Sequence, residues 1–338
     1  EMDAELDWWG PAVEVIRELL GGQAERARGV LAVGVCGLVP CLCALDASGE
    51  PLRPAILYAD NRALDDLARV PAGLGLTAEA LTPKLLWIKR REPRVYAAAR
   101  AVLSAHNYVV YRLTGRMCVD YDTASIFGGI FDPRAKIWDR SAAVEMGLPG
   151  DIWPDPLPAP AAAGEVSAAA ARATGLLAGT PVLAGSGDTF PSIVGCGSVD
   201  PGDATIAVGT SGLLTLTRRP LLDAVMGPHF DDGSGAAAVG WGANVLSAGQ
   251  LVSWYAAQLG LPGTDCALED AELLRRLESG ARSVPPGAEG LIALPHWQGR
   301  RTPLPDARLR GALIGLTPRH TAAHIYRALL ESFGYNLR

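Results

Sequence analysis

Two turns of small residues hold the groups in this sequence that are best suited to chemistry. An apolar run at 181–184 leads into Gly-Ser-Gly and then Asp188, and a second apolar run at 204–208 leads into Gly209. A carboxylate at the end of a strand can accept a proton, and the backbone N–H groups of a glycine loop can hold a phosphate. Together the two turns favour proton removal beside a bound phosphate.

A structural explanation also exists for each turn, and the spacing alone leaves both explanations open. Asp188 could hydrogen-bond its own backbone, as Asp commonly does beside glycine. The sequence Gly209-Thr210-Ser211-Gly212 is typical of a tight β-hairpin turn, and it could equally cradle a phosphate with backbone N–H groups and two hydroxyls. The chain has no GxxxxGK[ST] loop, and no GxGxxG lies between a strand and a helix, so neither a Walker loop nor a dinucleotide site is indicated.

Other polar groups give weaker signals. Asp60, Asn61 and Arg62 could cap a following helix, or they could hydrogen-bond a polyhydroxylated ligand. His320 and His324 are four residues apart, but an HExxH pattern and a third ligand are missing, so we interpret them as a helix face and expect no protein-held metal. A GxSxG motif is also missing, which argues against a hydrolase triad.

The composition is that of a globular protein with room for two domains. Of 338 residues, 49% are hydrophobic and 20% are charged, and the formal net charge is −6. No basic block is present to bind nucleic-acid phosphates, and no apolar run approaches the roughly 18 residues that span a bilayer. The acidic start of the chain does not resemble a signal peptide. The six cysteines form no CxxC pair, as expected for buried thiols in a reducing cytoplasm.

Helix-like and strand-like patterns alternate along the chain. The spacing of Trp9, Val13, Ile16 and Leu20 predicts an amphipathic helix. The near-continuous apolar run at 29–35 predicts a buried strand. Further helices are expected over 83–113 with an interruption near Pro93, over 168–174, near 267–278 and after Pro318, and further strands at 41–46, 55–58, 116–132, 204–217, 236–241 and 291–294. Strands mixed with helices of this length indicate an α/β class.

Several longer stretches match one known family in sequence and in order. They are PLRPAILYADNRA (51–63), the segment 83–115, VDYDTAS (119–125), VLAGSGDT (182–189), AVGTSG (207–212) and the segment 294–338. With these stretches the chain resembles the FGGY carbohydrate kinases, the group that contains xylulokinase, ribulokinase and glycerol kinase. The resemblance runs over nearly the whole length, and the last stretch is similar to the C-terminal signature of the family.

The resemblance implies an actin/hexokinase-like α/β fold, with two RNase H-like domains around a central cleft. Residues 1–199 are then expected to form the sugar-binding domain and residues 200–338 the nucleotide-binding domain. The implied reaction is the phosphorylation of a hydroxyl group on a ketopentose-like sugar or polyol, with ATP as donor and Mg²⁺ as cofactor. The expected partners are the sugar, ATP and a second copy in a homodimer, with no nucleic acid and no membrane, and the expected location is the cytoplasm.

The resemblance also implies roles for individual residues. Asp188 matches the base that takes the proton from the sugar hydroxyl, and Thr189 and Asp60 match positions that contact the sugar. The positions that contact ATP and its phosphates are matched by Gly209, Thr210, Gly249 and Ser253.

Two features depart from the family pattern. No DxGT phosphate loop is found near Glu1, and no Gly-rich adenine-binding segment is found near Arg338, so we expect a chain truncated at both ends with apolar surface left uncovered. Val39 and Pro40 stand where xylulokinases carry a Met-His pair that contacts the sugar, which disfavours D-xylulose itself.

Two alternative functions follow. A non-catalytic sugar- or nucleotide-binding relative, or a truncated fragment without the DxGT loop, would keep the fold without kinase activity. An ATPase of the actin or chaperone type would use the same fold, but the stretches at 83–115 and 294–338 favour a kinase.

Overall fold

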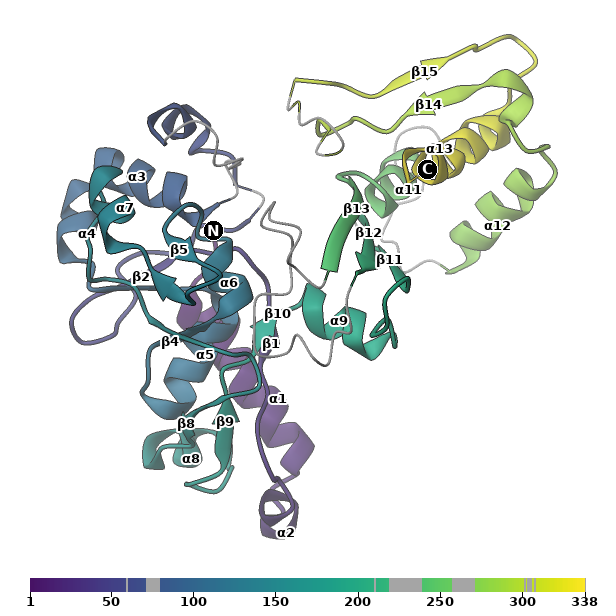
Figure 1. The fold of residues 1–338 in the computed structure, drawn as a ribbon. Coiled ribbons are helices and arrows are strands. Elements are labelled where there is room, and N and C mark those ends of the chain that lie inside the picture. The colour runs from purple at the N-terminus through teal and green to yellow at the C-terminus, as the bar shows by residue number, and fades with distance from the viewer. Residues whose placement is uncertain are drawn as a thin grey trace. The chain divides into compact units, whose positions relative to one another are not determined.

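The computed structural model divides into two units, whose helices and strands are drawn in Figure 1. Each unit has its own hydrophobic core. The first unit contains Glu1–Val199, and the second contains Asp200–Arg218 and Val239–Arg338. The structure describes residues 1–58, 60–70, 80–209, 211–218, 239–256, 271–300, 302, 306 and 308–337.

Helices of the first unit begin and end at recognisable signals. Its helices are η1 (Ala4–Trp9), α1 (Gly10–Leu20), α2 (Ala24–Arg28), η2 (Leu64–Arg69), α3 (Leu81–Arg91), α4 (Pro93–Ala98), α5 (Ala105–Thr114), α6 (Tyr121–Ser125), α7 (Arg140–Glu145), α8 (Ala168–Thr174) and α9 (Thr189–Gly195). Asp3 caps η1 and Ser167 caps α8 through their side chains. The predicted amphipathic helix is α1, which ends where Gly21 takes a φ of 57°, a left-handed conformation that favours glycine.

The strands of the first unit are short and pair two by two. They are β1 (Cys36–Gly37), β2 (Cys43–Leu45), β3 (Ala101–Leu103), β4 (Cys118–Asp120), β5 (Phe131–Asp132), β6 (Ile137–Trp138), β7 (Asp155–Leu157), β8 (Ala162–Glu165), β9 (Pro181–Leu183) and β10 (Ser186–Gly187). The pairs β1–β10 and β4–β7 are parallel, and the pairs β2–β3, β5–β6 and β8–β9 are antiparallel. The β1–β10 pair brings segments that are far apart in the sequence side by side (Figure 1).

Two hydrophobic clusters hold the first unit together. One gathers side chains of α1, α5 and α8 with those of β2, β3 and β9, and it includes the fully buried Tyr108. The other contains the apolar residues of α3 and an aromatic group in which the Phe127 ring packs edge-on against Trp138 and Trp153, with centroids 5.1 and 5.9 Å apart. Such aromatic pairs add about 0.5–1.5 kcal/mol beyond the area they bury.

The apolar run at 29–35 does not form the predicted buried strand. It makes a single isolated bridge, between Val33 and Val182, and Leu31 is 86% exposed. A continuous apolar run forms a buried strand only where other elements cover both of its faces, and the described residues leave Leu31 uncovered. The nearest regular strand is β1, which begins at Cys36.

Two other regions are divided more finely than the pattern predicted. The helical region 83–113 is interrupted at Glu92 as expected, but β3 then separates α4 from α5. The strand-like region 116–132 contains the helix α6 between β4 and β5. Asp120 explains this helix, because its carboxylate accepts a hydrogen bond from the Thr123 N–H and so caps α6.

The second unit combines an antiparallel sheet with a hairpin and helices. Its elements are β11 (Ala204–Val208), β12 (Gly212–Thr217), β13 (Val239–Val245), α11 (Gly249–Tyr255), α12 (Ala271–Arg282), η4 (Ala288–Gly290), β14 (Ile292–Leu294), β15 (Ala312–Ile314) and α13 (Ala322–Leu337). The strands β11, β12 and β13 form the sheet, and β14 pairs with β15. The first residues of the expected strand 236–241 and helix 267–278 lie outside the described part of the chain. α13 approaches β12 so closely that a Cβ on Gly212 would collide with the Phe333 ring.

Candidate active site

Asp188 lies directly after β10, where the chain turns into α9. Its backbone N–H donates to Gly37 O at 2.9 Å, which continues the parallel β1–β10 pairing by one residue. The Asp188 carboxylate is exposed and makes no capping hydrogen bond to α9, so its own helix does not use it. The Thr189 hydroxyl donates to Asp188 Oδ1 at 3.4 Å. The geometry therefore presents a carboxylate to solvent at a strand end, with a hydroxyl beside it.

Val39 supplies an apolar surface next to Gly187, the residue before Asp188. Its side chain packs against Gly187, where an added Cβ would collide with it. Val39 and the neighbouring Pro40 are both half-buried. Neither side chain can donate or accept a hydrogen bond.

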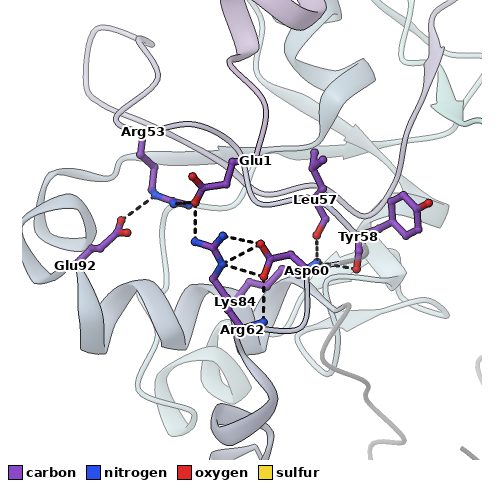
Figure 2. A network of polar contacts seen from close by, with 8 residues as sticks. All are labelled: Glu1, Arg53, Leu57, Tyr58, Asp60, Arg62, Lys84 and Glu92. Atoms are coloured by element: carbon purple, nitrogen blue, oxygen red, sulfur yellow. Dashed lines mark hydrogen bonds and ion pairs between the residues drawn. The ribbon is translucent and has the colours of Figure 1, made fainter. Parts of the chain in front are cut away.

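Asp60 is held by Arg62 rather than capping a helix. Arg62 Nε donates to both carboxylate oxygens of Asp60 at 2.9 Å, and the second nitrogen of the fork, Nη2, donates to Asp60 Oδ2 at 2.6 Å (Figure 2). The Arg62 N–H also donates to Asp60 Oδ1 at 3.0 Å. These hydrogen bonds from Arg62 keep the pKa of Asp60 below its ordinary value, so Asp60 is an ionised acceptor with a fixed orientation.

The Asp60–Arg62 pair belongs to a larger network of charges. Arg62 and Arg53 both bind Glu1, and Arg53 Nε lies 2.8 Å from Glu92 Oε2 (Figure 2). The Arg62 guanidinium also lies over the Trp87 ring, 4.9 Å from its centroid. A ring below the guanidinium and carboxylates around it leave Arg62 few alternative positions.

Lys84 is a further buried charge that the sequence reading did not single out. It is fully buried in the first turn of α3, and its Nζ donates to Leu57 O at 2.8 Å (Figure 2). Burial lowers the pKa of Lys84 to about 8, although the neighbouring Cys41 and Asp60 favour the charged form. Burial likewise raises the pKa of the Cys41 thiol to about 11. The charge of Lys84 lowers this pKa, and the charge of Asp188 raises it. The one sequence signal is a lysine within an otherwise apolar run, PKLLW.

His106 and Asp120 form a buried pair close to Gly37 of β1. His106 Nε2 is 2.7 Å from Asp120 Oδ2, and both side chains are completely buried. The His106 backbone and Cβ lie within contact distance of a Cβ placed on Gly37, the residue that receives the Asp188 N–H. Burial alone would raise the pKa of Asp120, but His106 and the Thr123 N–H outweigh it, and the pKa is lowered. No sequence motif points to this pair, because the two residues belong to different elements.

The second unit brings together two of the predicted nucleotide-contact positions. Gly209 directly follows strand β11, and the Gly249 N–H donates to Gly209 O at 2.8 Å. The Gly209 N–H donates to Ser211 O at 2.8 Å, so the turn is a closed hairpin connection. Ser253 lies one turn into α11, and its hydroxyl donates to Gly249 O at 3.4 Å. Thr210 lies outside the described residues.

The described residues contain no group of three or more His, Cys, Asp or Glu side chains that could hold a metal ion. Within the same described part of the chain, no helix combines the length and the apolar character that a membrane crossing needs.

Comparisons with known proteins identify the family of the chain. Residues 2–195 match the N-terminal domain, and residues 204–338 match the C-terminal domain, of the FGGY family of carbohydrate kinases. Xylulose kinase from Bacillus subtilis (strain 168) is 28% identical over 342 residues, which cover 98% of this chain and 66% of that protein. Xylulose kinase from Escherichia coli (strain K12) is 30% identical over 354 residues, which cover 100% of this chain and 69% of that protein.

A solved structure gives the same result. The crystal structure of xylulose kinase from Rhodospirillum rubrum matches with a TM-score of 0.71 and 28% identity, covering 90% of this chain and 62% of that chain. These matches define the class of protein, which is an α/β protein with the actin/hexokinase-like fold. The chain belongs to the FGGY family of carbohydrate kinases. It spans 66% of the length of the Bacillus subtilis relative. The fold class and family predicted from the sequence are confirmed.

Proposed function

We propose that the protein is a carbohydrate kinase that transfers the γ-phosphoryl group of ATP to a hydroxyl group of a ketopentose-like sugar or polyol. The observation that carries the proposal is the position of Asp188 in a chain of the FGGY family. Its carboxylate is exposed at the end of β10, its backbone is tied to Gly37, and it does not cap its own helix.

Asp188 is the proposed general base. As the sugar oxygen forms its bond to the γ-phosphorus, the bond from that phosphorus to the leaving oxygen of ADP breaks, and the hydroxyl proton passes to the Asp188 carboxylate. The transition state of phosphoryl transfer is loose, so position and charge matter more than covalent chemistry. Thr189, beside the base, and Asp60, oriented by Arg62, are proposed to hold the sugar hydroxyls.

The nucleotide is proposed to bind to the second unit, in keeping with a sugar domain at 1–199 and a nucleotide domain at 200–338. Its contacts would be Gly209, Thr210, Gly249 and Ser253. Two of these, Gly209 and Gly249, lack side chains and so allow a phosphate to approach the backbone. When bound, Mg²⁺ neutralises charge on the phosphates. In proteins, Mg²⁺ usually keeps several waters and binds through one or two carboxylates together with substrate phosphates.

The apolar surface beside the base bears on the choice of sugar. Val39 and Pro40 cannot hydrogen-bond a hydroxyl, so a sugar with a hydroxyl directed at them would lose a hydrogen bond to water without a replacement. This disfavours D-xylulose itself and favours a related sugar or polyol.

The test is phosphate transfer from ATP by the full gene product, measured as ADP release with D-xylulose, D-ribulose and glycerol. Asp188→Asn is expected to lower kcat by about 10²–10⁴-fold, the usual contribution of a general base. Asp151→Asn is the matched control, because Asp151 is an exposed aspartate outside the site, and its kcat should not change.

Three outcomes would contradict the proposal. Undiminished turnover in Asp188→Asn would remove Asp188 as the base. ATP turnover that ignores every sugar would indicate an ATPase, and sugar-dependent thermal stabilisation without any turnover would indicate a binding protein. A ligand at about 100 times its Kd adds roughly 2.7 kcal/mol of stability, which such a thermal measurement detects.

The proposed location is the cytoplasm, and the proposed assembly is a homodimer. The described cysteines Cys36, Cys41, Cys43, Cys118 and Cys196 are all free thiols, which suits a reducing compartment. Cys266 lies outside the described residues. The mass of the protein in solution, measured by light scattering, tests the assembly.

A further inference from the structure

Lys84 is a buried residue of the first unit that shares a hydrogen-bond acceptor with Asp60, the predicted sugar-contact residue. Its Nζ donates to Leu57 O at 2.8 Å, and the same carbonyl accepts the Asp60 N–H at 3.2 Å. Tyr58 O lies 3.5 Å from the same Nζ. Lys84 therefore contacts the backbone at Leu57 and Tyr58, where the chain turns toward Asp60 (Figure 2).

The burial of this lysine needs an explanation beyond packing. Lys84 has no exposed surface, whereas lysine is almost never fully buried unless it is paired. The ionisable groups that face it are Cys41, from the segment before β2, and Asp60 and Arg62, from the segment before η2. Of the two predicted carboxylates, Asp60 is the one whose charge acts on Lys84.

We propose that Lys84 is a positioning residue that holds the turn between Leu57 and Asp60, so that the Asp60 carboxylate is presented to the sugar. The proposal deepens the kinase assignment and rests on it. Lys84 does not touch the sugar. It acts through the Leu57 carbonyl, while Arg62 holds the other end of Asp60 by its carboxylate.

The variant that tests this role is Lys84→Met, which keeps the length of the side chain and removes the charge and the donor. Lys89→Met is the matched control, because Lys89 lies on the same helix and also donates to a backbone carbonyl, that of Gly147. Loss of a charged hydrogen bond at the turn should raise the sugar KM of Lys84→Met about tenfold or more and change kcat much less. Lys89→Met should keep both constants.

The pH dependence separates positioning from mere packing. With its pKa near 8, Lys84 loses its proton as the pH rises through 8, so the sugar KM of the unchanged protein should rise there. In Lys84→Met the KM should already be raised and should stay flat over the same range. A parallel rise in both proteins would overturn the proposal.

The expected direction of the stability change in Lys84→Met gives a separate test of its folding. The folded pKa of Lys84 lies below the ordinary 10.5, so the charged lysine opposes folding at neutral pH, and the stability of the unchanged protein should rise between pH 8 and 10.5. The urea midpoint of Lys84→Met at pH 7 should accordingly be unchanged or higher. A variant that unfolds at lower urea and keeps its sugar KM would show a purely structural lysine and would overturn the proposal.

Amide hydrogen exchange keeps the inference testable if no sugar is turned over. The Asp60 and Arg62 amides both donate within this turn, and their exchange should accelerate about tenfold or more in Lys84→Met but not in Lys89→Met. Failure of the kinase assignment would leave this result standing. Unchanged exchange together with an unchanged KM would reject the role of Lys84 alone.

Discussion

The two units organise their predicted site residues by different means. In the first unit side chains hold Asp60, since Arg62 binds its carboxylate and Lys84 binds the turn before it. In the second unit the backbone makes the closer contact, since the Gly249 N–H donates to Gly209 O at 2.8 Å while the Ser253 hydroxyl makes only a 3.4 Å contact within its own helix.

This difference fits the proposed binding of the sugar to the first unit and of the nucleotide to the second. Hydrogen bonds between side chains distinguish one arrangement of hydroxyls from another, which suits a variable sugar. Backbone positions without side chains accept a phosphate of any nucleotide. We therefore expect the first unit to be sensitive to changes of charge and the second to changes of space.

The largest effect is expected from Asp120→Ala in the first unit. This change leaves His106 buried without its carboxylate, and breaking a buried pair from one side costs roughly 3–5 kcal/mol. The measurement is urea unfolding at pH 7. Because the folded pKa of Asp120 lies below the ordinary 3.8, its stabilising effect is present above that pH and is lost as the pH falls through the folded value.

Asp139→Ala is the control for this change. Asp139 also caps a helix, by accepting from the Ala142 N–H at 2.9 Å, but it is exposed and has no histidine partner. Loss of the cap alone should cost about 1 kcal/mol. Equal losses of unfolding free energy in the two variants would show that the buried pair adds nothing to stability. They would contradict the expectation that the first unit is the one sensitive to changes of charge.

An intermediate effect is expected from Gly212→Ala in the second unit. The new methyl group would meet the Phe333 ring, and overpacking of this kind costs about 1–3 kcal/mol. Gly334→Ala is the control, because Gly334 lies in the same helix as Phe333 with open space around it, and alanine there should stabilise by up to about 1 kcal/mol. Thermal unfolding measures both, and a neutral Gly212→Ala would contradict the importance of space in this unit.

The smallest effect is expected from Ser253→Ala. The 3.4 Å contact of its hydroxyl contributes little to folding, so the free energy of unfolding should change by less than about 0.5 kcal/mol. If Ser253 contacts the nucleotide, the KM for ATP should rise by about 2–10-fold while the sugar KM stays constant. Ser125→Ala in α6 removes a comparable hydroxyl, which donates to Tyr121 O, and should leave the KM for ATP unchanged. A larger change in sugar KM than in ATP KM would reverse the assignment of the two units.

Local signals in the sequence correctly predicted the elements whose ends are set by residues within them or next to them. The helix α8 has the expected bounds, because Ser167 caps it and Gly175 ends it. The break between α3 and α4 falls at Glu92, directly before Pro93, because proline cannot continue the preceding helix. The apolar run at 29–35 was mispredicted, because burial depends on neighbours that a local pattern does not contain.

The sequence by itself determined the fold class and the family, through long stretches in a set order, and it placed Asp188 in a turn at a strand end. Only the tertiary structure decided what surrounds that turn. It showed that Gly37 anchors the Asp188 backbone, that Arg62 occupies both oxygens of Asp60, and that Lys84 lies buried beside them. The reason is physical, because hydrogen bonds and burial between residues far apart in the chain depend on distances that only the folded structure defines.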